Sequence, residues 1–241
     1  MNKINELFVR SKLKDKKIKI FNFNLTFSDL FFLYKQISSK KSFLRSTHNL
    51  FLKKNINIKG SIADLGSGNN YEYHKYIKDK KVKVDRFDFH KVDKESFRVN
   101  LEKKFTFKKK YECILIFNVM EHILNNENLI NSISKNLKKK GKLEIFVPFM
   151  FRFHSDPNDF FRPTHTYLIN LLEKNGFKVQ TNLIAVGPMS VILEILFKYL
   201  KLDILKFFVS ILFILLNKFF NLFSKDFKNY YCGTHCSCIK K

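Results

Sequence analysis

The chain has 241 residues, of which 45% are hydrophobic and 16% aromatic, so it is long and apolar enough to form a folded domain rather than a disordered tail. Its 45 basic and 21 acidic residues give a formal net charge of +24, a balance that suggests nucleic acid or an anionic membrane as a partner. Only six of the basic residues are Arg, and general surface solvation by Lys explains most of the charge. We therefore do not expect nucleic-acid binding.

The first quarter of the chain is the most basic, with 14 basic and 3 acidic residues among residues 1–60. The N-terminus has no continuous apolar stretch of the length that an export signal needs, so we expect a cytoplasmic protein. Capping side chains at 25–29 precede an apolar run over 30–34, and a second helical pattern covers 43–51. These patterns predict a basic helical segment over residues 1–45.

From residue 61 onward, apolar strand patterns alternate with helical patterns. The expected strands are Ser61–Leu65, Val82–Phe89, Ser96–Asn100, Cys113–Phe117, Leu143–Pro148, Phe177–Val186 and Tyr230–Ile239. One expected helix begins at Asn126 and ends before Gly141, and another begins at Thr164 and ends before Gly176. Strands that alternate with helices predict an α/β fold with a parallel sheet covered on both faces.

Residues 188–228 interrupt this alternation with a stretch rich in Phe and Leu. Its longest nearly uninterrupted apolar run, 207–216, has ten residues, whereas a membrane-spanning helix needs roughly 18 to 20. We predict a hydrophobic helical insertion that is either a buried hairpin or a helix lying in a membrane interface. The chain then divides into residues 1–45, a core at 46–187, the insertion, and a last strand within 229–241.

The stretch Asp64-Leu65-Gly66-Ser67-Gly68 is the most informative in the sequence. An apolar strand ends there in an acidic residue and two glycines, which let a ligand approach the backbone closely at the carboxyl edge of a sheet. The stretch lacks the third glycine of the dinucleotide fingerprint and the Lys-Ser or Lys-Thr pair of a phosphate-binding loop. It therefore predicts a nucleotide-type crevice of another kind.

Asp88 ends the next expected strand, twenty residues after Gly68. A carboxylate at this position can accept hydrogen bonds from both hydroxyls of a ribose. Asp85 lies on the same strand and is the alternative, because the sequence does not decide which of the two faces the crevice.

Two later segments extend this pattern. The strand 113–117 is followed by Asn118-Val119-Met120-Glu121-His122, and the fifth strand by Val147-Pro148-Phe149 and then His154-Ser155-Asp156-Pro157-Asn158-Asp159-Phe160-Phe161-Arg162-Pro163-Thr164. Over residues 45–190 the chain resembles the class I S-adenosylmethionine-dependent methyltransferases, in particular a small-molecule, type 11-like subgroup associated with sugar, polysaccharide or lipid modification. The resemblance implies a Rossmann-like methyltransferase sheet, mostly parallel with an antiparallel last strand, and a hydrophobic helical insertion before that strand.

The resemblance also implies S-adenosyl-L-methionine as the cofactor. The cofactor-binding residues that it implies are Asp64, Gly66, Ser67, Gly68, Asp88, Asn100 and Asn118. Asn100 stands where these enzymes usually have an Asp that contacts the adenine, and an Asn carbonyl can accept the same hydrogen bond without charge assistance. Asn118 would lie beside the sulfonium, where Glu121 and His122 would close the pocket.

Methyl transfer from a sulfonium is an in-line displacement, in which holding the acceptor near the methyl group can contribute up to roughly 7 to 11 kcal/mol. A hydroxyl acceptor must also lose its proton. His154 is the candidate base, because the unperturbed pKa of histidine is about 6.5, and Asp156 can orient it. The alternative is that Asp156, Asp159 and Arg162 form a structural clasp around a non-catalytic His154.

The C-terminal Cys232, Cys236 and Cys238 predict neither a disulfide framework nor a metal site. In an extended strand these three side chains share one face while His235 points to the other, so they predict buried residues of the last strand. No metal site is expected elsewhere in the sequence.

We expect methyl transfer, at oxygen, to a small-molecule, sugar or lipid-linked acceptor. The insertion at 188–228 would bring the protein into peripheral contact with the inner face of a membrane. One alternative is a non-catalytic methyltransferase-like module that docks on a membrane or a partner. The other is a nucleic-acid methyltransferase, which the charge favours and the absence of an Asn-Pro-Pro-Tyr motif opposes.

Overall fold

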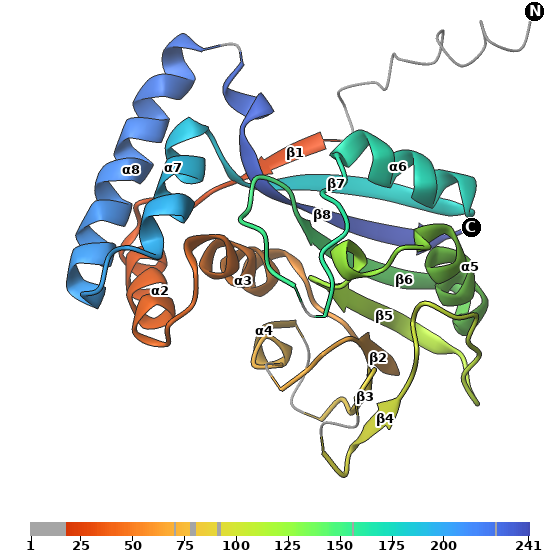
Figure 1. The fold of residues 1–241 in the computed structure, drawn as a ribbon. Coiled ribbons are helices and arrows are strands. Elements are labelled where there is room, and N and C mark those ends of the chain that lie inside the picture. Colours follow the sequence, from red (N-terminus) through yellow and green to blue (C-terminus); the bar gives the residue numbers. More distant parts are fainter. Residues whose placement is uncertain (1–17, 70, 78–80, 91–92, 156, 225) are drawn as a thin grey trace, which may run out of the picture.

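A computed structural model describes residues 18–69, 71–77, 81–90, 93–155, 157–224 and 226–241 (Figure 1). Its strands form one sheet of order β1-β7-β8-β6-β5-β2-β3-β4. They are β1 (Ile18–Phe21), β2 (Ile62–Leu65), β3 (Val84–Asp88), β4 (Ser96–Arg98), β5 (Tyr111–Phe117), β6 (Leu137–Pro148), β7 (Phe177–Val186) and β8 (Tyr231–Lys240). All neighbours pair in parallel except β8, which is antiparallel to β6 and β7. The structure therefore confirms the predicted mostly parallel sheet with an antiparallel last strand.

Helices cover both faces of the sheet. One face packs against α5 (Asn126–Asn136) and α6 (His165–Lys174), and the other packs against α2 (Phe27–Ser38), α3 (Phe43–Asn55) and the short α4 (His74–Ile77) (Figure 1). Each face encloses its own hydrophobic cluster, so the core forms two layers on either side of the central strands.

Helix starts follow the predicted caps closely. The hydroxyls of Thr26 and Thr164 accept hydrogen bonds from backbone N–H groups three residues later, at the starts of α2 and α6. At α5 the cap is Asn125 rather than Asn126. The predicted end of α5 was also wrong, because the helix stops at Asn136 and residues 137–140 extend β6.

The prediction of a wholly helical segment over residues 1–45 was wrong at Ile18–Phe21. These residues form the edge strand β1, which pairs in parallel with Thr181–Ile184 of β7. Ile18 and Phe21 are partly buried while Lys19 and Ile20 are exposed, as suits a short strand at the edge of the sheet. Residues 1–17 lie outside the described part of the chain.

The insertion is helical, as predicted, and consists of α7 (Pro188–Phe197) and α8 (Asp203–Phe223), followed by the 3₁₀ turn η3 (Phe227–Asn229). It connects the carboxyl end of β7 to the start of β8, so it lies at the same edge of the sheet as the glycine turn after β2 (Figure 1). No helix within the described ranges combines the length and the apolar character that crossing a membrane requires.

The buried side of α8 is unusually polar. Ser210, Ile214 and Asn217 are its buried residues. The Asn217 amide accepts a hydrogen bond from the N–H of Met189 (3.0 Å) and donates to the hydroxyl of Ser190 (2.7 Å) in α7. Polar contacts thus help to hold the two helices together, and most large apolar side chains of α8 face away from the core.

Candidate active site

A cavity of about 230 Å³ lies at the carboxyl ends of β2 and β5. We call it the cofactor cavity. Its walls come from α3, the glycine turn after β2, the start of α4 and the end of β5. The residues that line it are Arg45, His48, Asn49, Gly66, Ser67, Gly68, Asn69, Tyr73, Phe117 and Asn118.

The two glycines of the turn differ in what surrounds them. Gly66 and Gly68 adopt φ values of +70° and +53°, a region that side chains other than glycine rarely occupy. A Cβ on Gly66 would lie 2.4 Å from Cγ2 of Val119, whereas a Cβ on Gly68 would meet nothing within 4 Å. Gly66 therefore lets the turn pack against the segment after β5, and Gly68 borders open space in the cavity.

The structure separates the two candidate aspartates on β3. The carboxylate of Asp88 accepts a hydrogen bond from the N–H of Gly68 (2.9 Å), so it lies beside the glycine turn. Asp85 lies near the other end of the strand, where it accepts from the hydroxyl of Tyr111 (2.7 Å) and pairs with Lys109 (2.7 Å). Burial raises the pKa of Asp85, but these contacts outweigh it and the pKa is lowered. Asp88 is therefore the aspartate beside the glycine turn, although neither aspartate is among the residues that line the cofactor cavity.

Asp64 and Ser67 each leave a buried polar atom without a partner among the described residues. Oδ2 of Asp64 accepts from the hydroxyl of Tyr73 (2.5 Å) and lies 2.6 Å from Nε2 of His74, whereas its Oδ1 has no partner. The hydroxyl of Ser67 is also buried and unpartnered. Buried polar atoms of this kind are costly unless a ligand or water satisfies them.

The two predicted asparagines differ in position. Asn118 lines the cofactor cavity and adopts φ +54°, a strained conformation that is often found at functional sites. Asn100 follows β4, and its side-chain carbonyl accepts a hydrogen bond from the N–H of Glu102 (2.9 Å). Asn100 is not among the residues that line the cofactor cavity.

Three titratable side chains meet on the acceptor side of this edge. Glu121 and His122 belong to the turn η2 (Met120–His122), and His154 follows β6. Oε1 of Glu121 lies 3.8 Å from Nε2 of His122 and 3.9 Å from Nε2 of His154. Glu121 is fully buried, neither of its oxygens has a partner within the described ranges, and burial raises its pKa to about 8. We call these residues the Glu–His–His group.

His154 is held by the clasp that the sequence offered as its alternative role. The carboxylate of Asp159 accepts from the backbone N–H of His154 (2.8 Å) and forms an ion pair with Arg162. Asp156, the predicted orienting residue, lies outside the described residues. Burial, with a smaller contribution from His122, lowers the pKa of His154, so its ring is neutral at pH 7.

A second cavity, of about 380 Å³, lies between the segment after β6 and helix α7. We call it the acceptor cavity, because the sequence predicts the acceptor on this side of the sheet's carboxyl edge. It is lined by Met150, Phe151, Arg152, Val191, Glu194, Ile195, Lys198 and Tyr199. The ring of Phe151 lies 5.5 Å from that of His154, so the acceptor cavity borders the Glu–His–His group.

The first turn of α3 contacts both cavities. The N–H of Leu44 donates to Glu194 of the acceptor cavity (2.6 Å), and the next residue, Arg45, lines the cofactor cavity. The sequence analysis overlooked Arg45 and His48. The available signal was an Arg, scarce in this chain, on a helix just before the strand that leads into the glycine turn.

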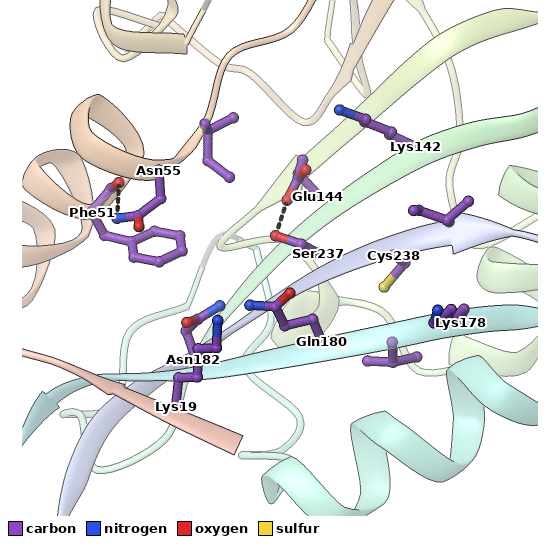
Figure 2. Close-up of a pocket in the computed structure, with 13 residues that line it drawn as sticks. Lys19, Phe51, Asn55, Lys142, Glu144, Lys178, Gln180, Asn182, Ser237 and Cys238 are labelled. Atoms are coloured by element: carbon purple, nitrogen blue, oxygen red, sulfur yellow. Dashed lines mark hydrogen bonds between the residues drawn. The ribbon is translucent and has the colours of Figure 1, made fainter. Parts of the chain in front are cut away.

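A larger cavity, of about 420 Å³, lies at the opposite edge of the sheet, near the amino ends of β6 and β7 (Figure 2). Glu144 and Ser237 face it and are hydrogen-bonded to each other (2.6 Å). His235 links Glu144 (2.9 Å) to His48 (3.0 Å) through the interior. Because parallel sheets bind ligands at their carboxyl ends, this larger cavity is not the candidate active site.

The comparison with known families agrees with this geometry. A family model described as "Methyltransferase domain" matches residues 37–182, more than half of the chain. The chain belongs to this methyltransferase family. It is therefore an enzyme whose cofactor is S-adenosylmethionine. No curated protein matches the sequence.

Solved structures share the fold of this methyltransferase at low sequence identity. An S-adenosylmethionine dependent methyltransferase from Mesorhizobium loti has a TM-score of 0.52 and 9% identity, covering 82% of this chain and 98% of that chain. A methyltransferase in complex with the Trm112 activator of Haloferax volcanii has a TM-score of 0.51 and 10% identity, covering 90% and 99%. The cyclase SpnF has a TM-score of 0.51 and 9% identity, covering 80% of each chain. The fold is therefore shared by proteins with different names and reactions.

The residues of the methyltransferase's cofactor cavity fit S-adenosylmethionine. The open space at Gly68 admits a ligand against the backbone, and the unpartnered hydroxyl of Ser67 in the cavity wall can satisfy a polar group of an amino acid. Asp64 lies behind this turn, fully buried and outside the lining. Arg45 places a cation in the wall, which suits a carboxylate. When bound, the cofactor supplies the electrophilic methyl group.

Proposed function

We propose that this methyltransferase transfers a methyl group to a hydroxyl oxygen of a lipid-linked acceptor. Asp64, Ser67 and the backbone at Gly66 and Gly68 hold the methionine part of the cofactor, and Asp88 accepts from the ribose. Asn118 lies beside the sulfonium. Asn100 contacts the adenine through its side-chain amide, whose carbonyl also accepts a hydrogen bond from the N–H of Glu102.

The observation that carries the proposal is the position of His154 beside Phe151 of the acceptor cavity and next to Glu121. Its ring borders the acceptor cavity through Phe151, and it faces Glu121 of the turn that follows β5 beside the cofactor cavity. A neutral imidazole there accepts the proton of an acceptor hydroxyl as the oxygen attacks the methyl group. The methyl group's bond to sulfur breaks as its bond to oxygen forms.

The lining of the acceptor cavity supports an amphiphilic, anionic acceptor. Phe151, Val191 and Ile195 provide apolar wall, while Arg152 and Lys198 provide two cations. Burial raises the pKa of Glu194 to about 7, so at neutral pH this carboxyl offsets the two cations only in part. A phosphate next to a hydrocarbon chain matches this combination better than a free neutral sugar does.

The surface of the insertion supports contact with a bilayer of anionic lipid. On α8, Phe208, Leu212, Leu215, Phe219, Leu222 and Phe223 are all between 48% and 77% exposed. The ring of Tyr34 in α2 lies 5.5 Å from Phe207, which extends this apolar face beyond the insertion. Exposed Lys198, Lys201 and Lys218 lie in the same region. Amphipathic helices with apolar and cationic side chains bind bilayer interfaces in this way.

A direct test compares two acceptors with the same sugar. One is a hexose linked through diphosphate to a polyprenyl chain in anionic vesicles, and the other is the free hexose phosphate. We expect kcat/KM for methyl transfer to be at least tenfold higher for the lipid-linked sugar, because only this acceptor has a hydrocarbon chain that can contact the apolar wall of the acceptor cavity. Equal kcat/KM for the two would contradict the lipid-linked class and leave a small-molecule acceptor.

A further inference from the structure

The Glu–His–His group brings together three atoms of the kinds that bind metal ions. One carboxylate oxygen of Glu121 and one ring nitrogen each of His122 and His154 lie within 4.8 Å of one another. The rings of His122 and His154 are nearly perpendicular, with centroids 5.1 Å apart. Two segments that follow different strands therefore converge on one point.

The orientation of His122 leaves a lone pair directed toward this point. Its Nδ1 is hydrogen-bonded to the backbone carbonyl of Asn158. A carbonyl can only accept, so Nδ1 carries the hydrogen and Nε2, 3.8 Å from Glu121, is unprotonated in the neutral ring. Histidines that bind metals usually donate their other N–H to a carbonyl or carboxylate in this manner.

His154 has a similar environment. Its Nδ1 lies 3.4 Å from the carbonyl of Arg152 and 3.6 Å from the carboxylate of Asp159. A guanidinium nitrogen of Arg162 is also 3.4 Å away, but it donates to Asp159 and to the same carbonyl. Two acceptors therefore favour the hydrogen on Nδ1 and a free Nε2.

The environment of Glu121 is an independent observation that points to a bound cation. Its side chain is 0% exposed, and both carboxylate oxygens lack a hydrogen-bond partner among the described residues. A buried carboxyl group without a hydrogen-bond partner is unfavourable, whereas a bound cation would satisfy its oxygens. The ring nitrogens of His122 and His154 that lie 3.8 and 3.9 Å from Oε1 are the ones that present lone pairs.

We propose that Glu121, His122 and His154 bind a divalent transition-metal ion. Two imidazoles and one carboxylate suit Zn²⁺, Fe²⁺ or Mn²⁺. The two separations from Glu121, 3.8 and 3.9 Å, exceed by about 0.5 Å the roughly 3.3 Å edge of a tetrahedral site with bonds of about 2.05 Å, and all three atoms lie within 4.8 Å of one another. Side-chain rotations must therefore bring the three ligands closer together when the ion binds. With three protein ligands the ion keeps open positions for a water or a substrate oxygen.

The inference rests on the proposed function for its consequence, since an acceptor hydroxyl would take an open position. The ion would lower the pKa of that hydroxyl, and its proton would pass to solvent water before the oxygen attacks the methyl group. His154 then serves as a ligand and not as the proton acceptor. The metal and the free imidazole are thus alternative ways to activate the same oxygen.

The test measures metal binding by the full chain after treatment with a chelator. Isothermal titration with Zn²⁺ and absorption spectroscopy with Co²⁺ report the binding, and titration with S-adenosylhomocysteine reports the integrity of the fold. The variants are Glu121→Gln, which keeps the size of the side chain, and His122→Ala. The control is His165→Ala, which removes a histidine that contacts Tyr231 instead of this group.

We expect one Zn²⁺ per chain, with affinity at least tenfold weaker in Glu121→Gln and in His122→Ala and unchanged in His165→Ala. Wild-type protein that binds S-adenosylhomocysteine but no Zn²⁺ at 100 µM overturns the metal site and leaves the proposed function intact. Equal Zn²⁺ affinity in wild type and both variants also overturns it. Metal binding without binding of S-adenosylhomocysteine contradicts the proposed function and not the metal site.

Discussion

The two halves of the sheet's carboxyl edge hold cavities with different kinds of lining. At β2 and β5 the cofactor cavity is lined by the glycine turn, by Asn118 and by side chains of α3, with positive φ angles at Gly66, Gly68 and Asn118. Beyond β6 and β7 the acceptor cavity is formed by side chains of the insertion and of the segment after β6. A turn whose positive φ angles require glycine tolerates few substitutions. Side chains on an insertion can be replaced without disturbing the sheet. The boundary between the halves is the Glu–His–His group.

The largest expected effect comes from removing the imidazole at this boundary. His154→Ala should lower kcat roughly 10²- to 10⁴-fold and leave the affinity for S-adenosylhomocysteine within about twofold, because His154 acts on the acceptor oxygen. Steady-state kinetics and calorimetry measure the two effects. His122→Ala, tested in parallel, should be nearly as damaging if a metal ion is required and almost harmless if His154 alone takes the proton.

Loss of folding or of cofactor binding in His154→Ala, without a separate effect on kcat, would instead assign His154 to the structural clasp with Asp159 and Arg162. The Glu–His–His group would then have a structural role and not a catalytic one.

A smaller effect is expected from the carboxylates on β3. Asp88→Ala should weaken binding of S-adenosylhomocysteine by roughly 10- to 150-fold, since hydrogen bonds to a charged group contribute about 1.5 to 3 kcal/mol. Asp85→Ala should leave this affinity unchanged and lower thermal stability, because it removes the partner of Tyr111 and Lys109. The reverse order of affinities would mean that Asp88 does not face the ribose.

Binding to anionic vesicles is expected to weaken about tenfold when exposed apolar side chains of α8 are removed. The double variant Phe208→Ser with Leu212→Ser should reduce co-sedimentation with anionic vesicles, since each side chain buries apolar surface in the interface. The matched control, Phe97→Ser with Ile239→Ser, removes side chains of similar exposure from β4 and β8. Binding should also weaken as the Debye length falls from about 10 Å at 0.1 M salt to about 3 Å at 1 M. Wild-type protein that stays in the supernatant at low salt contradicts the membrane contact.

The smallest effect concerns Glu194, whose burial raises its pKa to about 7 from an ordinary value of 4.5. The folded state then holds a proton that the unfolded state has lost, so the free energy of unfolding decreases as pH rises from about 4.5 through 7. Between pH 5 and pH 8, Glu194→Gln should lose less stability than wild type, by on the order of 2 kcal/mol. Urea unfolding at the two pH values measures this difference. An equal loss of stability in wild type and Glu194→Gln would mean that Glu194 is solvated.

Much of the cofactor half could be predicted because its residues are close in sequence to strand ends. The glycine turn, Asp88 and Asn118 each follow a recognisable apolar strand. Arg45 was overlooked because it lies on a helix whose pattern reports only its buried face, and β1 because four residues are too few for a clear period.

The acceptor half depends on contacts that no local pattern contains. The meeting of Glu121 with His154 joins segments separated by 33 positions, and the acceptor cavity exists only once α7 packs beside the segment after β6. The unpartnered carboxylate of Glu121, which motivates the metal site, is likewise visible only in three dimensions. The sequence did predict that the cysteines of β8 are buried, and they are free and buried. The prediction that all three share one face was wrong, because Cys232 packs in a different hydrophobic cluster from Cys236 and Cys238.

The most direct test of the central claim, that the cavity at Gly68 binds the cofactor, is calorimetric titration of S-adenosylhomocysteine into wild type, Gly68→Val and Gly176→Val. Both glycines have positive φ (+53° and +84°), and a Cβ at either meets nothing within 4 Å, so the two variants carry comparable backbone strain. Gly66 is unsuitable, because a side chain there would strike Val119 and disturb folding. We predict binding to wild type and Gly176→Val and no measurable binding to Gly68→Val. Equal affinity in all three proteins would contradict the account.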